Sequence, residues 1–331
     1  MLQAGSGFGA AQLTAAKELA AKEFAAKEIA AKQPCGRLRP KKVKHWKEDK
    51  ALKIIQLRNF TPIQMMGFII ITDGGKVIVI DGGNKGDADG FLETLAGAAG
   101  GACHIDAWFM THPHDDHYGV FKELTERALR GAPIPSCDGF YFCRQDDSLG
   151  EHEKHFAGQI VEFNEAVART KYPLIELKRG DCFSFDNVRF EVLRVANPEI
   201  HENAFNNSSC VFRLTEDRGA KPPFVTIFLG DLGIEGGREL LAAYPEGSLK
   251  ADALQLAHHG QNGVSREVYE AIAPRIALYC TPDWLWYNTI DPQKPGEGPW
   301  QTLEVRRWLE EIGAVPVRAC LKNVILDTAF F

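Results

Sequence analysis

The segment that most constrains the fold is MTHPHDDHYGV, residues 110–120. It places three histidines and two aspartates between His112 and His117, directly behind the apolar run IDAWFM and ahead of the helical pattern GVFKELTERAL. Where a strand ends and a helix begins, rigid elements on both sides hold a loop that faces solvent, which favours function there. We therefore expect partners for this cluster at the ends of other strands.

Three further segments place polar side chains where a predicted strand stops. The segment VIVIDGG carries Asp81, TIFLGDLG carries Asp231, and LQLAHHG carries His258 and His259. We expect these strand ends to point to one edge of the fold. Imidazole nitrogens and carboxylate oxygens are the ligands that zinc prefers after thiolate, so the combined set predicts two adjacent divalent metal ions.

The alternation of strand-like and helical segments from residue 52 onward predicts an α/β fold. The runs LKIIQLR, MGFIIIT and KVIVID are nearly continuously apolar, as in strands of sheets that are covered on both faces. Later strands are predicted at IDAWFM, NVRFEVLRV, SCVFRLT, FVTIFLG, ADALQLA and RIALYC. Helical spacing predicts helices at DADGFLETLAGAA and over residues 119–130, 151–169, 238–244, 266–272 and 301–312.

The first fifty residues have a different character. Residues 13–32 read LTAAKELAAKEFAAKEIAAK, in which strong helix formers and Glu-to-Lys pairs four residues apart favour a helix. The apolar members recur every five residues and spiral around that helix, so they form no continuous stripe for a core. The likeness to EAAAK linkers indicates a helical low-complexity or engineered appendage over residues 1–34, followed by a basic linker over residues 35–51.

The charge is divided unevenly along the chain. Residues 1–53 carry twelve Lys and Arg against five acids, so the remainder, with 26 basic against 39 acidic residues, has a net charge of −13. An acidic domain does not attract polyanions nonspecifically, which favours a small-molecule substrate and leaves nucleic acid as an alternative only for the basic linker. No run approaches the roughly 18–20 apolar residues of a membrane span, and no secretory pattern opens the chain, so no membrane is expected. The eight cysteines include no CxxC pair, which favours reduced thiols and a cytoplasmic location.

The ordered set IDGG, THPHDDH, FLGDLG and AHHG resembles the metallo-β-lactamase-fold hydrolases, and the HxHxDH element is specific for them. Within that superfamily, NNSSCVFRL, FLGD, HHG, SREVYEAIAPRIALYC and LEVRRWLEEIGAVPV resemble the ComEC-like branch, which contains the hydrolase domain of DNA-uptake competence proteins and the phosphorylcholine esterases. The resemblance implies a four-layer αββα sandwich of two mixed sheets, forming one metal-dependent hydrolase domain over residues 52–331.

The resemblance also implies roles for the clustered side chains. His112 and His114 would hold one metal ion, while Asp116 and His117 would hold the other, and Asp231 would bridge the two ions. Many members of the superfamily carry a further histidine for the first ion, before the strand that precedes the Asp231 strand. This chain has NAFNNSSC there, so Asn207, Ser208 or water would complete the first ion's ligands. The departure disfavours the glyoxalase-type thioesterases and lactonases.

One of the two adjacent histidines would complete the ligands of the second ion. Strand alternation through Leu254 and Leu256 favours His258 as that ligand. His259 is then a candidate proton donor to the leaving group, or a hydrogen-bond donor in the transition state. Asp81 would lie behind the ligands and orient a metal-bound imidazole.

A Pro- and Gly-rich segment after RIALYC gathers four aromatic side chains, Trp284, Trp286, Tyr287 and Trp300. Such loops shape substrate pockets, and tryptophans accept quaternary ammonium groups through cation–π contact. A satellite core that pins a long loop is the alternative. We take Asn207, Trp284, Trp286 and Tyr287 as candidate substrate-contacting residues.

The implied function is hydrolysis by a hydroxide bound to a dinuclear metal centre, with Asp116, His259 and Asp81 as catalytic residues. Two cations lower the pKa of a shared water and neutralise the charge that develops on the scissile group. Hydrolysis of a small phosphoester or phosphodiester is accelerated most by such a centre, because the attacking oxygen and the leaving oxygen can each contact a metal ion. Zn²⁺ is the expected ion, with Mn²⁺ or Fe as alternatives. A carboxylic-ester, lactone or amide hydrolase and an inert interaction or display scaffold are the alternative functions.

Overall fold

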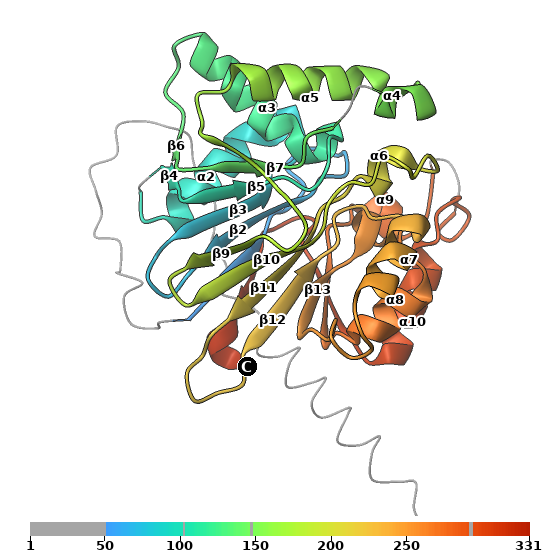
Figure 1. Cartoon of the computed structure of the whole chain (residues 1–331). Coiled ribbons are helices and arrows are strands. Elements are labelled where there is room, and N and C mark those ends of the chain that lie inside the picture. Colours follow the sequence, from blue (N-terminus) through green and yellow to red (C-terminus); the bar gives the residue numbers. More distant parts are fainter. Residues whose placement is uncertain (1–50, 102, 146–147, 291–293) are drawn as a thin grey trace, which may run out of the picture. The chain divides into compact units, whose positions relative to one another are not determined.

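Two seven-stranded sheets, packed face to face, form the centre of the fold (Figure 1). In this computed structural model the described residues are 51–331, except 102, 146–147 and 291–293. The predicted N-terminal helix and all of the basic linker except Ala51 lie outside them.

The first sheet has the strand order β16-β1-β2-β3-β5-β7-β8. Strands β16, β1, β2 and β3 are antiparallel neighbours, and β3, β5, β7 and β8 are parallel neighbours, so the sheet is mixed. The strands are β1 (Lys53–Gln56), β2 (Gly67–Ile71), β3 (Val77–Asp81), β5 (Ala107–Phe109), β7 (Phe140–Phe142), β8 (Leu174–Glu176) and β16 (Val324–Asp327).

The second sheet has the order β15-β14-β13-β12-β11-β10-β9 and is also mixed. Strands β12 to β15 are parallel neighbours, and β9 to β12 are antiparallel. The strands are β9 (Cys182–Phe185), β10 (Val188–Arg194), β11 (Val211–Glu216), β12 (Phe224–Phe228), β13 (Ala253–Gln255), β14 (Ile276–Tyr279) and β15 (Val315–Arg318). Strands β4 (His104–Ile105) and β6 (Ser136–Cys137) form a separate short parallel pair.

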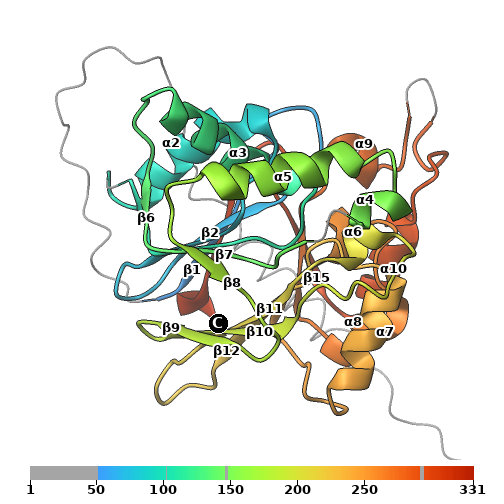
Figure 2. The same ribbon diagram turned by 45° about the horizontal axis from the view of Figure 1, so that its top comes forward.

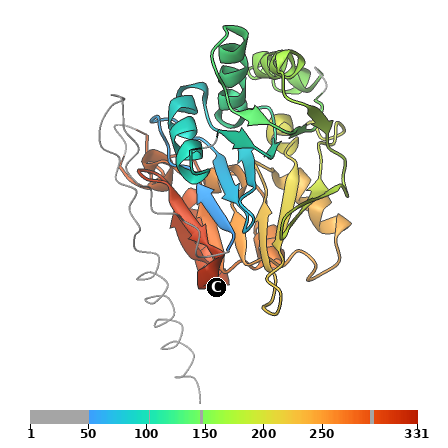
Figure 3. The same cartoon turned by 90° about the vertical axis from the view of Figure 1, so that its left-hand side faces the viewer.

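Helices cover the outer faces of both sheets, as Figures 1–3 show from three directions. Helices α2 (Ala88–Ala98), α3 (Asp115–Leu129) and α5 (Ala157–Arg169) pack on the first sheet, and α7 (Ile234–Ala243), α8 (Arg266–Ile272) and α10 (Thr302–Ile312) pack on the second. The layers therefore run helix, sheet, sheet, helix, which confirms the predicted αββα sandwich. Shorter turns are α4 (Leu149–His152), α6 (Ala204–Asn207), α9 (Asp283–Trp286), η1 (Lys85–Asp87), η2 (Ala257–Gly260) and η3 (Thr328–Phe330). Within the described part of the chain, no helix has the length and apolar character that crossing a bilayer requires.

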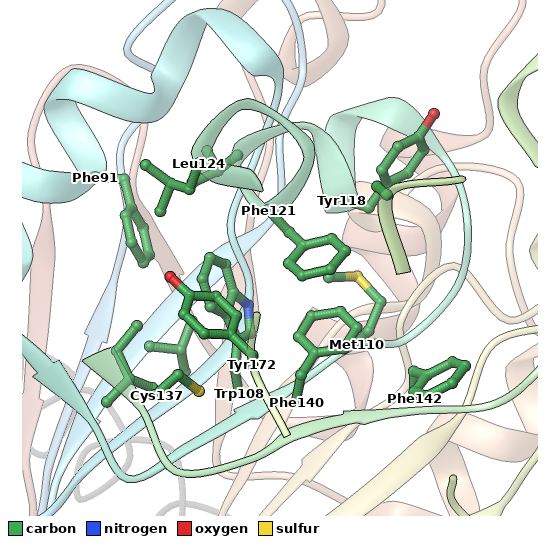
Figure 4. Packing of buried hydrophobic residues seen from close by; sticks show 14 of the residues in the cluster. Phe91, Trp108, Met110, Tyr118, Phe121, Leu124, Cys137, Phe140, Phe142 and Tyr172 are labelled. Carbon is green, nitrogen blue, oxygen red and sulfur yellow. The ribbon is translucent and has the colours of Figure 1, made fainter. Parts of the chain in front are cut away.

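An aromatic cluster holds the first helical layer on its sheet (Figure 4). Its centre is the fully buried Trp108 of β5, whose ring stacks on Phe91 of α2 at 5.4 Å and meets Phe121 of α3 edge-on at 5.9 Å. Such ring pairs add to the free energy that area burial alone supplies. The indole Nε1 of Trp108 also donates a hydrogen bond of 2.8 Å to the carbonyl of Asp81. The core therefore positions the end of β3 directly.

Several element boundaries differ from the sequence-based prediction, and helix α7 begins at Ile234 instead of about residue 238. Helix α3 begins at Asp115 instead of about residue 119, because His114 has an extended backbone and serves as the N-cap. Acidic residues in a first helical turn are favourable beside the exposed backbone N–H groups, so Asp115 and Asp116 suit this start. The segment 151–169 contains two helices, since α4 ends at His152 before α5 begins at Ala157.

Parallel neighbours bring the predicted strand ends together. Strand β3 pairs with β5 in the first sheet, and β12 pairs with β13 in the second. The carboxyl ends of parallel strands meet at one edge of a sheet, which is where ligand sites of α/β folds form. Asp81, the His112–His117 cluster, Asp231 and the double histidine therefore lie at corresponding edges of the two packed sheets.

Candidate metal centre

Asp81 is a fully buried carboxylate at the last position of β3. Its Oδ1 accepts the backbone N–H of Thr111 at 2.8 Å, and its Oδ2 accepts the Thr111 hydroxyl at 2.8 Å and contacts Nδ1 of His117 at 2.8 Å. The residue has a φ of 54°, a left-handed conformation that few residues adopt, although aspartate tolerates it better than most. This turn directs the carboxylate back beneath the histidine cluster.

His112 and His114 face each other in the loop between β5 and α3. The Nε2 atom of His112 lies 2.9 Å from Nδ1 of His114, and both rings are buried. The ring of Phe205 from α6 stacks on His114, with centroids 5.3 Å apart and planes inclined by 8°. Packing against Phe205 therefore helps to fix the orientation of the His114 ring.

Asp116 and His117 occupy the first turn of α3 and reach inward. The Nε2 atom of His117 lies 3.9 Å from Oδ1 of Asp116 and 3.2 Å from Oδ1 of Asp231. Asp231 follows β12, and its backbone N–H donates to the Ser209 hydroxyl at 3.0 Å. The carboxylate of Asp231 is thus anchored through its own main chain, and its oxygens are left to face the imidazoles.

The double histidine differs from the prediction. Strand β13 ends at Gln255, and both His258 and His259 have positive φ values, 49° and 56°, within the turn η2. The assumption that strand alternation extends to position 258 is therefore wrong. The Nε2 atom of His259 lies 3.1 Å from Oδ2 of Asp116 and 3.5 Å from Oδ2 of Asp231.

His258 lies further from the cluster than its neighbour. Its Nε2 is 3.9 Å from Oδ2 of Asp231, and its side chain is partly exposed, whereas the side chain of His259 is fully buried. The Nδ1 atom of His258 is 2.7 Å from the carbonyl of Asn262. The geometry thus places His259 among the carboxylates and His258 at the margin.

The residues of the cluster fit a metal ion, because several of their buried polar atoms lack hydrogen-bond partners among the described residues. Nε2 of His117, Nε2 of His259 and both carboxylate oxygens of Asp231 are buried without a hydrogen bond of regular geometry, a costly arrangement unless a cation joins them. Four ligands about 2.0–2.1 Å from a tetrahedral zinc ion lie about 3.3 Å from one another. The separations of 3.1, 3.2 and 3.5 Å between these imidazole and carboxylate atoms match that spacing.

Burial and neighbouring carboxylates shift the pKa values of the clustered histidines in opposite directions. Burial lowers the pKa of His112 well below its usual range and that of His114 to about 4, so both rings are neutral near pH 7. Burial also opposes protonation of His259, but the carboxylates of Asp231 and Asp116 outweigh it and raise its pKa to about 9. Protons on imidazole thus balance the buried carboxylates, and a cation that binds there would replace them.

A family profile described as the metallo-beta-lactamase superfamily matches residues 68–143, from β2 through the strand β7 and its following residue. Residues 68–143 therefore match this superfamily, in agreement with the αββα sandwich of the two sheets. The matched segment includes Asp81 and the His112–His117 cluster, whereas Asp231 and the double histidine lie beyond it.

Comparison with individual proteins also found similar chains. ComE operon protein 3 of Bacillus subtilis is 29% identical over 182 residues, which are 54% of this chain and 20% of that protein, so the chain spans a fifth of its length. The metallo-beta-lactamase fold protein YhfI of Bacillus subtilis has a TM-score of 0.50 at 12% identity, covering 84% of this chain and 99% of YhfI. MEM-A1, a subclass B3 metallo-beta-lactamase from a soil metagenome library, has a TM-score of 0.41 at 13% identity, covering 63% and 76% of the two chains.

The Asn207 side chain uses both its oxygen and its nitrogen in hydrogen bonds within the protein. Its Oδ1 accepts the backbone N–H groups of Gly233 and Gly236, and its Nδ2 donates to Glu202 and Glu235. The side chain thus joins α6 to the start of α7, and the structure does not support the predicted contact with substrate. The Ser208 hydroxyl donates its proton to the carbonyl of Phe205 at 2.6 Å, whereas the Oδ1 atom of Asn207 accepts two backbone N–H groups and is already saturated.

The aromatic candidates of the domain divide between two sides of α9. Trp286 packs edge-on against Tyr279, and the guanidinium of Arg306 lies 3.8 Å from its ring centroid, so its face is covered. Trp284 lies near Trp300 instead, and Tyr287 is half exposed. The predicted role of Trp286 in substrate contact is therefore unsupported, because the ring belongs to the core behind the loop.

Three residues that support the candidate metal centre were not predicted from the sequence. Gln64 donates from Nε2 to Oδ2 of Asp116 at 3.0 Å, and Thr111 contacts Asp81 as described above. The Gln255 side chain accepts from the N–H of Gly230 at 2.8 Å and donates to its carbonyl at 3.0 Å. This clamp ties the end of β12 to β13 and so holds Asp231 beside the double histidine. A threonine directly before the first histidine is the one sequence cue that identifies such a supporting residue.

Proposed function

We propose that the chain is a metal-dependent hydrolase whose centre holds two divalent ions and acts on a small phosphoester or phosphodiester. The observation that carries the proposal is the pair of buried Asp231 oxygens, which face the Nε2 atoms of His117 and His259 without regular hydrogen bonds. Two bound ions supply a water nucleophile that ionises near neutral pH, and they neutralise charge on phosphoryl oxygens. Zn²⁺ suits the nitrogen and oxygen donors best, and Mn²⁺ or Fe use similar donors.

The two ion positions are unequal in this proposal. Asp116, His117, His259 and Asp231 provide four side chains for one ion, which suffices for a tetrahedral site. His112 and His114 provide only two imidazoles for the other, with Asp231 shared. The Oδ1 atom of Asn207 already accepts two backbone N–H groups, and the Ser208 hydroxyl donates its proton to the carbonyl of Phe205. We therefore assign weaker binding to the ion at His112 and His114, with water completing its ligands.

Asp81 and His258 support the reaction without holding an ion. Asp81 accepts from Thr111 and faces Nδ1 of His117, which leaves Nε2 of that ring directed to the cations. His258 is directed toward the same cluster from its margin, and its partial exposure lets it contact the bound substrate. The preference for a small substrate follows from the net charge of −13 on residues 54–331, which opposes long polyanions unless the basic linker binds them.

The test combines metal analysis with two chromogenic substrates. The purified chain should bind up to two equivalents of Zn²⁺ or Mn²⁺ and hydrolyse bis-p-nitrophenyl phosphate faster than p-nitrophenyl acetate. Asp116→Ala and His117→Ala should abolish turnover and reduce metal content without unfolding the protein. Asp115→Ala, which removes the exposed neighbour of Asp116, is the matched control and should keep full activity.

Each other outcome contradicts a stated part of the proposal. Faster cleavage of the acetate ester would favour a carboxylic-ester hydrolase of the same fold. A chain without bound metal and without either activity would favour an inert interaction scaffold. Full activity of Asp116→Ala would show that Asp116 is not required at the proposed metal centre.

A further inference from the structure

Asp87 is a fully buried carboxylate that the proposed reaction does not use. It ends the turn η1, and its Oδ2 accepts the backbone N–H of Asn84 at 2.9 Å and the side-chain Nδ2 of Asn84 at 3.1 Å. Burial raises the pKa of Asp87, and these hydrogen bonds from Asn84 act in the opposite direction. A buried charge is costly unless hydrogen bonds satisfy it, so the contact holds Asn84 in one orientation.

Asn84 connects this carboxylate to the loop between β1 and β2. A side-chain amide nitrogen carries two hydrogens, and the second hydrogen of Asn84 is donated to the carbonyl of Gln64 at 2.7 Å. Two residues further along the same loop, the backbone N–H of Met66 donates to the carbonyl of Asp116 at 3.0 Å. The main chain at Gln64 is therefore held between η1 on one side and the first turn of α3 on the other.

The side chain of Gln64 extends these contacts to a proposed metal ligand. Its Nε2 donates to Oδ2 of Asp116 at 3.0 Å, and the same oxygen lies 3.1 Å from Nε2 of His259. The second distance is close to the roughly 3.3 Å that separates two ligands of a tetrahedral zinc ion. A carboxylate oxygen offers two lone pairs, so Oδ2 can accept the amide hydrogen and still bind an ion.

The position of Asp116 in α3 does not by itself determine which way its carboxylate turns. The torsion that rotates an aspartate carboxylate is broad and roughly two-fold, unlike the torsions between tetrahedral carbons. Among the described side chains that contact this carboxylate, His117 and His259 are proposed ligands of the ion. Gln64 donates through an amide nitrogen, which has no free lone pair for a metal, so it can still orient Asp116 when an ion is bound.

We propose that Gln64 is a positioning residue that turns the Asp116 carboxylate toward His259, and that Asn84 and Asp87 hold Gln64 where it can do so. The inference rests on the proposed function, because that function assigns Asp116 to the metal centre. Loss of a partner that supports a metal ligand weakens metal binding by about 10- to 100-fold. Loss of the Gln64 amide should therefore weaken Zn²⁺ binding, although Gln64 does not itself bind the ion.

Competition for Zn²⁺ between the metal-free full chain and a fluorescent chelator tests the inference without relying on turnover. Gln64→Met keeps the length of the side chain but has no N–H to donate, and it should bind Zn²⁺ at least about tenfold more weakly. Gln64→Asn is one methylene shorter, so its amide falls short of Asp116 and the same loss is expected. Gln159→Met is the matched control. Gln159 accepts the backbone N–H of Asp115, the neighbour of Asp116, at 3.0 Å, so this variant should bind Zn²⁺ like the wild type.

Variants of Asn84 and Asp87, together with the spectrum of bound Co²⁺, separate positioning from a general loss of structure. Asn84→Ala and Asp87→Ala should each weaken Zn²⁺ binding, whereas Asp87→Asn retains an acceptor oxygen for Asn84 and should keep the wild-type affinity. The visible absorption of bound Co²⁺ depends on the arrangement of ligands around the ion. It should therefore change in Gln64→Met and stay unchanged in Gln159→Met, while thermal melts show that both variants are folded.

Wild-type Zn²⁺ affinity in both Gln64 variants, or an equal loss of affinity in Gln159→Met, would overturn the inference. Wild-type affinity in both alanine variants would overturn the roles of Asn84 and Asp87. Hydrolysis of bis-p-nitrophenyl phosphate is measured on the same preparations. If the wild type hydrolyses this ester and Gln64→Met binds Zn²⁺ normally, the positioning role fails while the proposed function stands. If the wild type binds Zn²⁺ without hydrolysing the ester, and Gln64→Met binds Zn²⁺ more weakly, the proposed function fails while the positioning role stands.

Discussion

The substitution Asp81→Asn tests how the centre is held in position. The Asp81 carboxylate accepts two hydrogen bonds of 2.8 Å from Thr111, and Nδ1 of His117 lies 2.8 Å from the same group. Because both carboxylate oxygens are acceptors, the neutral ring of His117 keeps its proton on Nδ1 and leaves the Nε2 lone pair for a cation. The substitution changes this arrangement while leaving the size of the side chain almost unchanged.

An asparagine cannot satisfy all of these partners. With its oxygen toward the N–H of Thr111, its amide group faces Nδ1 of His117, and the ring proton must move to Nε2, the atom that faces Asp231. With the amide reversed, two donors meet at Thr111. Asparagine tolerates the left-handed backbone at position 81, so the fold should survive. Loss of such a supporting partner weakens metal binding by about 10- to 100-fold, or about 1.4–2.7 kcal/mol.

Competition for Zn²⁺ between the metal-free protein and a chromophoric chelator measures this loss. Asp106→Asn is the matched control, because Asp106 pairs with Lys76 at 2.9 Å and accepts the N–H of Val77 away from the centre. The control should bind Zn²⁺ like the wild type, and thermal melts should show that both variants are folded. Wild-type affinity in Asp81→Asn would refute the reasoning, since it would mean that Asp81 does not fix the tautomer of His117.

Three further outcomes are expected. His259→Ala should lose one bound metal ion while His258→Ala keeps both, as elemental analysis after dialysis would show; equal metal contents would contradict the assignment of His259. Gly119→Ala places a Cβ 2.4 Å from backbone of η1 and should cost about 1–3 kcal/mol of unfolding free energy. The helical Gly97→Ala has open space and should keep or raise the Tm; similar Tm values for the two glycine variants would refute the packing argument. Burial raises the pKa of the Cys280 thiol to about 12, so below that pH the thiol stays protonated, and iodoacetamide at pH 8 should leave it unmodified in the native protein. Rapid alkylation, detected by peptide mass spectrometry, would show that the site is accessible.

Much of the fold could be predicted because its central strands are apolar on both faces. The run KVIVID gives β3, all of whose five residues are buried, and RIALYC gives β14 in the same way. The C-terminal strands gave no comparable signal. Strand β15 contains Pro316, which only an edge strand accommodates, and β16 is mostly half-buried and pairs with β1 alone. Edge strands depend on a partner that is distant in sequence, so local patterns identify them poorly.

In the candidate site, too, features set by neighbouring residues could be predicted, and contacts between residues far apart in the sequence could not. The sequence identified the residue types at the strand ends, because a ligand cluster directly after an apolar run is a local pattern. The choice of His258 over His259 assumed that β13 continues to position 258, whereas the strand ends at Gln255 and both histidines lie in a turn with positive φ values. The contact of Gln64 with Asp116 joins residues 52 positions apart, so no local pattern could predict it.

The origin of the ligands has a consequence for how the protein unfolds. Asp116 and His117 come after β5, a strand of the first sheet, whereas Asp231 and His259 come after β12 and β13 of the second sheet. An ion bound among them would act as a removable cross-link between the two sheets of the sandwich. Its binding energy adds to the folding free energy as the free ion concentration rises above the dissociation constant. The melting temperature should therefore rise with metal occupancy. Removal of the ion should weaken the contact between the two sheets before it unfolds either sheet.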